Sequence, residues 1–211
     1  DYDQVISLAM SGQSPTFADV PRSVMNPTDA EQAMVDQDAL KEYQWSNADV
    51  EGAKKLLDDA GIVDTDGDGI RELDGQNINL HYVSYENRLL NDFSNAHIQY
   101  LAEIGIGCTA DYGSSDDQWS KLAAGDYDFN NNNWITVGTG DPYAYMANWA
   151  TDTTYCGYSN PEYDALFEQL KSEMDEDKRA DLIFQMQQIL VDDAAVLIDG
   201  YYNSSMIYSK N

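Results

Sequence analysis

Helical and strand-like patterns alternate along the first two thirds of this sequence, and that alternation constrains the fold more than any other feature. Helices are expected over about 47–60, 89–104 and 115–124, and strands over 77–85, 106–112 and 127–135. Strands separated by helices usually pair in one sheet whose faces the helices cover. The sequence therefore predicts an α/β domain with a largely parallel or mixed sheet.

The C-terminal third continues with helices and then with shorter segments. Asn160 caps one helix with Pro161 in its first turn, and Asp175 starts the next. A short helix is expected after Asp141, with Pro142 in its first turn. Segments 195–202 and 205–208 are expected as strands, residues 1–12 as a short helix, and the proline-containing stretch that follows as extended chain. We treat residues 1–211 as a single α/β lobe.

Single positions within these elements are also predicted. Ser46 or Asn47 is expected to cap the helix over 47–60, whose apolar residues share one face. In the helix over 115–124, the residues expected to point inward are Trp119, Leu122 and Ala123; His97 is expected to pack within its own helix.

Charge limits the partners of the chain. Its 38 acidic residues against 11 Lys and Arg give a formal net charge of −27. This charge repels phosphate backbones and anionic lipid, so nucleic acid and membrane surfaces are poor partners. No apolar run is long enough for a membrane span, and the opening DYDQVISLAM is not a signal peptide. Cys108 and Cys156 allow one disulfide or two thiols, and their spacing does not decide between these.

An acidic loop carries the sharpest local motif, Asp-x-Asp-x-Asp-Gly-x-x-Glu. Carboxylates at alternate positions, with glycine at the sharp turn, can wrap a hard cation such as calcium. The match to an EF-hand is incomplete, because the twelfth position is Gly75 and a strand follows the loop. An acidic turn without an ion is the alternative. The expected ligands are Asp64, Asp66, Asp68, the carbonyl of Ile70 and Glu72.

Catalytic motifs are weak in this sequence. Asp126 and Asp128 would lie on one side of a strand, as the paired carboxylates of a secreted hydrolase could. In so acidic a chain such pairs also arise by chance. The sequence contains no GxSxG, HExxH, GxGxxG or GxxxxGK[ST] motif. We therefore expect a protein that is not an enzyme.

The stretch from Gly125 to Trp149 suggests a binding surface. It combines a run of four asparagines with glycines and with aromatic residues around GTGDP. Aromatic faces beside amides, in a loop that follows a strand, are typical of a ligand wall. A minor core under a long loop is the alternative reading.

Several segments together resemble the family 5 extracellular solute-binding proteins, the oligopeptide- and dipeptide-binding components of ABC importers. These segments are AKKLLDDAGIVDTDGDGIRELDG, IQYLAEIGIGCTADY, the run from Trp119 through LAAGDYDF to Trp134 and GDP, and YSNPEYDALFEQLKSEMDEDKRADLIFQMQQILVDDAAVLIDGYY. The opening DYDQVISLAMSGQSPTFADVP is similar to the segment where the family's chain enters its second lobe. Each motif is modest, and their order and spacing carry the resemblance.

The resemblance implies a fold and a function. It implies the second lobe of a periplasmic-binding-protein type II fold, a mixed sheet flanked by helices, closing on ligand like a hinged trap. The first lobe, the signal and any membrane anchor would lie outside this chain. The implied function is extracytoplasmic binding of an oligopeptide or another small solute for delivery to an ABC permease, in the periplasm or outside the cell. The isolated lobe is expected to bind weakly.

The implied site lies in the same aromatic stretch. Trp134, Tyr143 and Trp149 would offer apolar faces, and Asn133, Thr139 and Asp141 polar contacts. Peptide-binding members place an aspartate shortly after the tryptophan to pair with the α-amino group. Here ITVGTG follows Trp134, so that acid is absent unless Asp141 replaces it. A secreted hydrolase using Asp126 and Asp128, or a calcium-dependent adhesion module, remains the alternative function.

Overall fold

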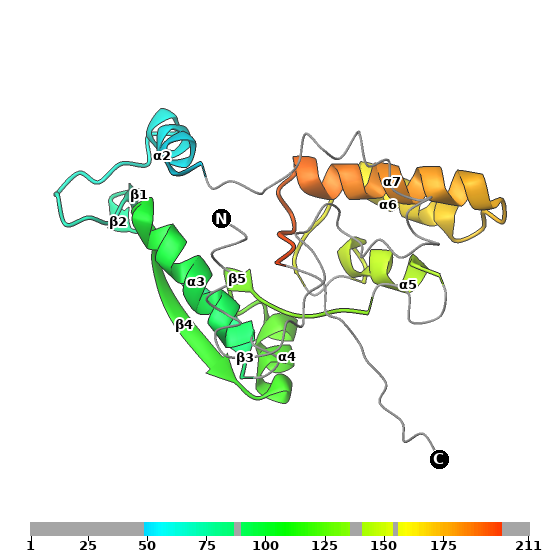
Figure 1. Ribbon diagram of the computed structural model, residues 1–211, viewed down its shortest axis with the longest axis horizontal. Coiled ribbons are helices and arrows are strands. Elements are labelled where there is room, and N and C mark those ends of the chain that lie inside the picture. The colour runs from blue at the N-terminus through cyan, green and yellow to red at the C-terminus, as the bar shows by residue number, and fades with distance from the viewer. Residues whose placement is uncertain (1–48, 87–89, 136–140, 154–155, 200–211) are drawn as a thin grey trace, which may run out of the picture. The chain divides into compact units, whose positions relative to one another are not determined.

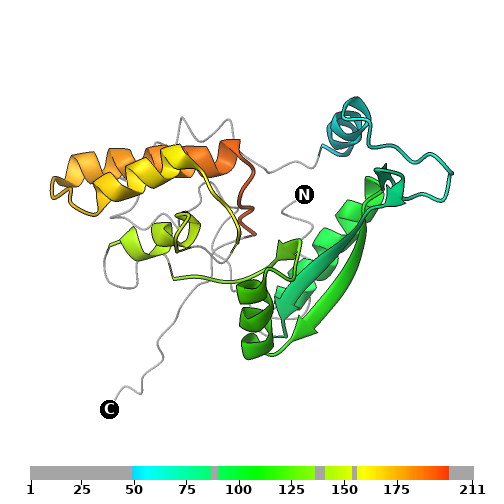
Figure 2. The same cartoon turned by 180° about the vertical axis from the view of Figure 1, so that it is seen from behind.

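The computed structural model describes residues 49–86, 90–135, 141–153 and 156–199, and these fall into two compact units. The sheet unit contains the described residues up to Trp134, and the helical unit contains those from Ile135 onward (Figures 1 and 2). The predictions for residues 1–48 and 200–211 lie outside the described residues. Within the described part, no helix combines the length and the apolar character that a membrane span needs.

A three-stranded parallel sheet forms the centre of the sheet unit. Its strands are β3 (Asn79–Tyr85), β4 (Gly107–Gly113) and β5 (Phe129–Asn130), in the order β4-β3-β5. The predicted α/β arrangement is confirmed, and every described pairing in this sheet is parallel. The third strand is much shorter than the predicted 127–135, because consecutive asparagines favour side-chain bonds to the backbone over ladder pairing.

Two helices cover the opposite faces of this sheet. Helix α3 (Leu90–Glu103) packs on β3 and β4, and α4 (Ser115–Ala124) packs on β3. The hydroxyl of Tyr82 bonds His97 on α3, whereas its neighbour His81 faces the polar network that includes Lys121 of α4. Successive strand residues point to opposite faces, so the two helices sandwich β3. His97 is half-buried and bonds Tyr82 of β3, so its contacts reach beyond its own helix.

Helix α4 has the expected bounds but a different inner face. The Ser114 hydroxyl caps it by accepting from the Asp117 amide at 3.2 Å, and Gly125 ends it with a left-handed φ of 69°. Its buried side chains are Gln118 and Leu122. The prediction that Ala123 points inward is wrong, because Ala123 is exposed and Gln118 takes the buried position.

The sheet unit begins with α2 (Val50–Asp59) and a small hairpin of β1 (Glu72–Leu73) and β2 (Gln76–Asn77). Asp49 caps α2 by accepting from the Gly52 amide at 2.8 Å; the predicted caps, Ser46 and Asn47, lie outside the described residues. The expected apolar face of α2 is not covered by the described residues, since α2 has no buried residue and Leu56 is 73% exposed.

Among its described residues, the helical unit consists of four helical elements and the turns that join them. They are α5 (Tyr143–Met146), the 3-10 turn η3 (Ala147–Trp149), α6 (Pro161–Leu170) and α7 (Glu176–Asp192). The predicted caps Asn160 and Asp175 are confirmed, since each accepts from amides of the first turn that follows. The strand predicted over 195–202 is wrong for 195–199, which are irregular; the rest lies outside the described residues.

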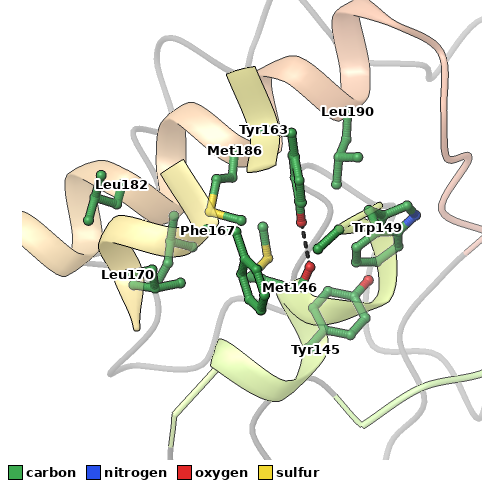
Figure 3. Packing of buried hydrophobic residues seen from close by; sticks show 11 residues of the cluster. Tyr145, Met146, Trp149, Tyr163, Phe167, Leu170, Leu182, Met186 and Leu190 are labelled. Atoms are coloured by element: carbon green, nitrogen blue, oxygen red, sulfur yellow. Dashed lines mark hydrogen bonds between the residues drawn. The ribbon is translucent and has the colours of Figure 1, made fainter. Parts of the chain in front are cut away.

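Helices α6 and α7 lie side by side (Figure 1), and Trp149 of η3 packs against the same core (Figure 3). The Tyr163 hydroxyl donates to the Met146 carbonyl at 2.6 Å, and burial raises the pKa of this tyrosine (Figure 3). Each fully buried apolar side chain contributes about 1.5–3 kcal/mol. The core comprises Tyr145, Met146, Trp149, Ala150, Tyr163, Phe167, Leu170, Leu182, Ile183, Met186 and Leu190.

Candidate functional site

Amide side chains organise the carboxyl edge of the parallel sheet. Gln118 of α4 is 1% exposed, and its amide donates to Asn130 Oδ1 at 2.7 Å and to the Asn131 carbonyl at 2.8 Å. Asn131 donates in turn to the Leu90 carbonyl at 3.3 Å. The asparagine run is therefore fixed from both helices and is not a free loop.

The run ends on an exposed tryptophan. The Tyr85 hydroxyl donates to Asn133 Oδ1, and the backbone N–H of Asn133 donates to Asn132 Oδ1 at 2.8 Å. The Trp134 side chain follows, 44% exposed, with its ring 5.6 Å from that of Trp119 at an angle of 77°. We call Tyr85, Gln118, Trp119 and residues 130–134 the amide–aromatic edge. It presents an indole surface beside uncharged hydrogen-bonding groups.

The other predicted site residues lie in the helical unit. Asp141 accepts from the Tyr143 amide at 2.7 Å and from Arg179 Nη2 at 2.6 Å. The Tyr143 ring stacks on Phe167 at 5.0 Å, and Trp149 is 6% exposed. The predicted site is thus divided: Asn133 and Trp134 are on the amide–aromatic edge, whereas Asp141, Tyr143 and Trp149 serve the helical unit's packing. Thr139 lies outside the described residues.

Tyr85 and Gln118 were not among the predicted site residues. Gln118 lies four residues before Leu122, and such residues share one helix face, so its burial was readable from that spacing. Tyr85 ends a strand pattern, which places it at the sheet edge but does not reveal its bond to Asn133.

The acidic loop gathers part of its predicted ligand set. One carboxylate oxygen from each of Asp64, Asp66 and Glu72 lies within 4.8 Å of the others. Asp68 is turned elsewhere, since its carboxylate accepts from Asn77 Nδ2 at 2.7 Å and from the Ile70 amide at 2.8 Å. Three oxygen ligands are chemically suited to calcium. Calcium itself stays a prediction.

The two aspartates proposed for hydrolysis surround His81. Asp126 lies 3.5 Å from its Nδ1, and Asp128 accepts from its backbone amide at 2.7 Å. On the other side, Asp111 lies 2.9 Å from His81 Nε2 and 2.7 Å from Lys121 Nζ. Lys121 and His81 hold the pKa of the Asp111 carboxyl below its ordinary value through hydrogen bonds. This network ties β3, β4 and α4 together.

The two cysteines are not joined in a disulfide in this structure. Cys108 is half-buried in the sheet unit, and Cys156 is exposed in the helical unit. Burial, followed by the charge of Asp128, raises the pKa of the Cys108 thiol.

Known structures share this architecture. The chain is similar to the periplasmic oligopeptide-binding protein of a Thermotoga maritima oligopeptide ABC transporter, with a TM-score of 0.77 at 20% identity over 92% of this chain and 38% of that one. The Thermotoga protein has also been solved with mannohexaose bound. The oligopeptide-binding protein AppA of Bacillus subtilis, in complex with a nonapeptide, has a TM-score of 0.70 at 20% identity over 92% of this chain and 38% of that one.

A third similar protein is the nickel ABC transporter of Bacillus halodurans, with a TM-score of 0.73 at 17% identity over 92% of this chain and 38% of that one. At such identities the likeness shows the fold, and it confirms the expected type II binding-protein architecture. The chain spans well under half the length of these proteins. None of the curated proteins compared with the sequence matches it.

A family model supplies the identification that structural likeness alone does not. The model described as "Bacterial extracellular solute-binding proteins, family 5 Middle" matches residues 1–155, which is more than half of the chain. The resemblance found in the sequence is thereby confirmed. The chain belongs to the bacterial extracellular solute-binding proteins of family 5.

Proposed function

We propose that this chain forms one part of the ligand cleft of a solute-binding protein that serves an ABC importer. Its family membership supports this proposal. The observation that carries it is Trp134, whose indole is 44% exposed at the end of the asparagine run that hydrogen bonds hold in place. A large apolar side chain beside convergent polar groups is the usual composition of a small-molecule site.

The topology of the sheet supports the same position. From β3 the chain crosses through α3 to β4 on one side, and from β4 it crosses through α4 to β5 on the other. The connections therefore diverge between β3 and β5, and ligands of open α/β sheets bind outside the carboxyl ends of the strands at such a point. Tyr85 is the last residue of β3, and residues 131–134 follow the carboxyl end of β5.

The ligand is a small solute, either an oligopeptide or another compound. The similar proteins are named for oligopeptides and for nickel, and one of them holds mannohexaose. The remainder of the protein, including a first lobe, would supply the opposite wall of the cleft. An export signal would also lie outside this chain. A membrane anchor outside this chain, or the permease itself, would keep the protein at the membrane. Asp141, Tyr143 and Trp149 then support the helical unit, and Thr139 remains a proposed polar contact.

Calorimetric titration of the chain against peptides, neutral oligosaccharides and nickel chelates tests this proposal. A ligand of one class should bind weakly, because the opposite wall is missing. Trp134→Ala should weaken that binding by at least about tenfold, whereas Ile135→Ala, at a neighbouring position that is 77% exposed, should leave it unchanged. Ligand binding that is unchanged in Trp134→Ala, or no binding of a ligand from any of the three classes, would overturn the proposal.

A further inference from the structure

The amide–aromatic edge has no charge of its own along the asparagine run. Residues 129–140, FNNNNWITVGTG, contain no ionisable side chain. Asp141, the next acid along the chain, is paired with Arg179 at 2.6 Å and also accepts from the Tyr143 amide. A ligand on this edge therefore meets amides and an indole, with no carboxylate from this segment free to receive an ammonium group.

Two buried amide atoms of this edge have no hydrogen-bond partner among the described residues. They are Gln118 Oε1, an acceptor, and Asn132 Nδ2, a donor. Buried polar groups without partners cost stability, so these two amides are positions whose bonding a water molecule or a ligand could complete. A hydroxyl group both donates and accepts, whereas an ammonium only donates and a carboxylate only accepts. A hydroxyl group is therefore the kind of ligand group that could bond both amide atoms, once a side-chain rotation brings them to the surface.

The exposed indole adds a flat apolar surface of fixed orientation. Trp119 contacts Trp134 edge-to-face at 5.6 Å and 77°, and Asn133 before it is held by Tyr85. Aromatic rings bury large apolar area against flat partners at little conformational cost. The apolar face of a pyranose ring, with hydroxyls around its rim, matches this combination of indole and amides.

We propose that the amide–aromatic edge is a subsite for a neutral, hydroxyl-rich ligand, an oligosaccharide whose ring covers Trp134. The proposal rests on the proposed function and names its substrate class. Trp134 contacts the ring, Asn132 and Asn133 lie beside its hydroxyls, and Gln118 holds the run in place. A cationic ligand is the rival, because the exposed Glu86 follows β3 at the same end of the sheet.

Titrations of the full chain with mannohexaose, maltohexaose and hexaglycine test the proposal at about 50 mM and about 500 mM NaCl. At least one hexasaccharide should bind, and its affinity should change less than about twofold between the two salt concentrations, because no charge is involved. Hexaglycine should bind at least about tenfold more weakly.

Variants locate the subsite. Asn132→Asp keeps the shape but removes the amide donor, so it should weaken saccharide binding about tenfold. Trp134→Phe should retain most of the binding, Trp134→Ala should lose it, and Ile135→Ala should match the unchanged protein. Thermal midpoints check that each variant is folded.

The outcomes separate the two proposals. Hexaglycine binding that needs Trp134, without saccharide binding, overturns the saccharide subsite and leaves the proposed function standing. Ligand binding that falls severalfold at high salt and is lost in Glu86→Gln also overturns it, in favour of a cationic ligand. Binding of none of the three probes at either salt concentration overturns the saccharide subsite, and failure across the wider ligand library overturns the proposed function as well.

Discussion

Trp134 and Trp149 belong to the same polar, aromatic stretch of sequence, but they have opposite surroundings. Trp149 is 6% exposed and lies 4.9 Å from the ring of Tyr145 in an apolar core, whereas Trp134 is 44% exposed after a run of asparagines. The difference shows that aromatic composition alone does not identify a ligand wall. The neighbours that fix the ring, apolar in one case and amide in the other, decide its role.

The two units differ in the same way on a larger scale. The helical unit buries contiguous apolar side chains from four elements, while the sheet unit commits a buried glutamine and several asparagines to its carboxyl edge. Polar groups at buried positions sacrifice stability that apolar packing would provide. Such local departures from good packing are expected at functional sites.

Phe167→Ala should have the largest effect on stability. The ring is 3% exposed and stacks on Tyr143, so its removal should lower the free energy of unfolding by about 3–5 kcal/mol. Trp134→Ala should lower it by less than about 1 kcal/mol, because the indole lies largely at the surface. Urea unfolding measures both values, and similar losses in the two variants would break the contrast between core and edge.

Arg179→Met should have the next largest effect. Arg179 donates to the carbonyls of Leu170 and Glu173 and pairs with Asp141, with a side chain only 16% exposed. Losing these charge-assisted bonds should lower the free energy of unfolding by about 2–3 kcal/mol. Lys178→Met removes a cation from the adjacent exposed position and should be close to neutral. If Asp141 binds ligand instead, Arg179→Met should change affinity more than stability.

Calcium should act on the sheet unit alone. If Asp64, Asp66 and Glu72 hold the ion, saturating calcium should stabilise the protein by about 1–3 kcal/mol and a chelator should reverse this. Thermal unfolding measures the shift, and Asp64→Asn should abolish it. An unchanged midpoint with calcium and with chelator would leave the loop as an acidic turn held by its own hydrogen bonds.

Acid should produce the smallest of these effects, again in the sheet unit. Lys121 and then His81 lower the folded pKa of Asp111 through hydrogen bonds, so their contribution is present above the unfolded pKa and lost as pH falls through the folded one. Asp111→Asn and Lys121→Met should each flatten the decline in stability below about pH 4. Equal acid sensitivity in both variants and the unchanged protein would contradict this assignment.

The sequence predicts much of this fold because its signals are local. Asn160 and Asp175 cap helices through their own side chains, and the spacing of apolar residues marks α3 and α4. The failures depend on distant partners. The strand after Asp128 stops early, and Ala123 is exposed because the buried place on α4 goes to Gln118, whose partners Asn130 and Asn131 lie on another element.

The candidate site was predictable only in part for the same reason. Aromatic and amide residues in one stretch indicated a binding surface, and Trp134 with Asn133 fits that prediction. Composition alone did not distinguish the buried Trp149 from the exposed Trp134, because the burial of Trp149 depends on packing with residues of other elements. Asp141 likewise depends on Arg179, which lies far along the chain.

The central claim is that Trp134 faces ligand while Trp149 does not, and the indole N–H resonances test it in one titration. Trp134→Phe and Trp149→Phe assign the two signals in ¹⁵N-labelled protein. On addition of a ligand found by calorimetry, the Trp134 signal should move progressively to saturation while the Trp149 signal stays in place. A saturating ligand that leaves the Trp134 signal unmoved, or moves both signals equally, would contradict the account.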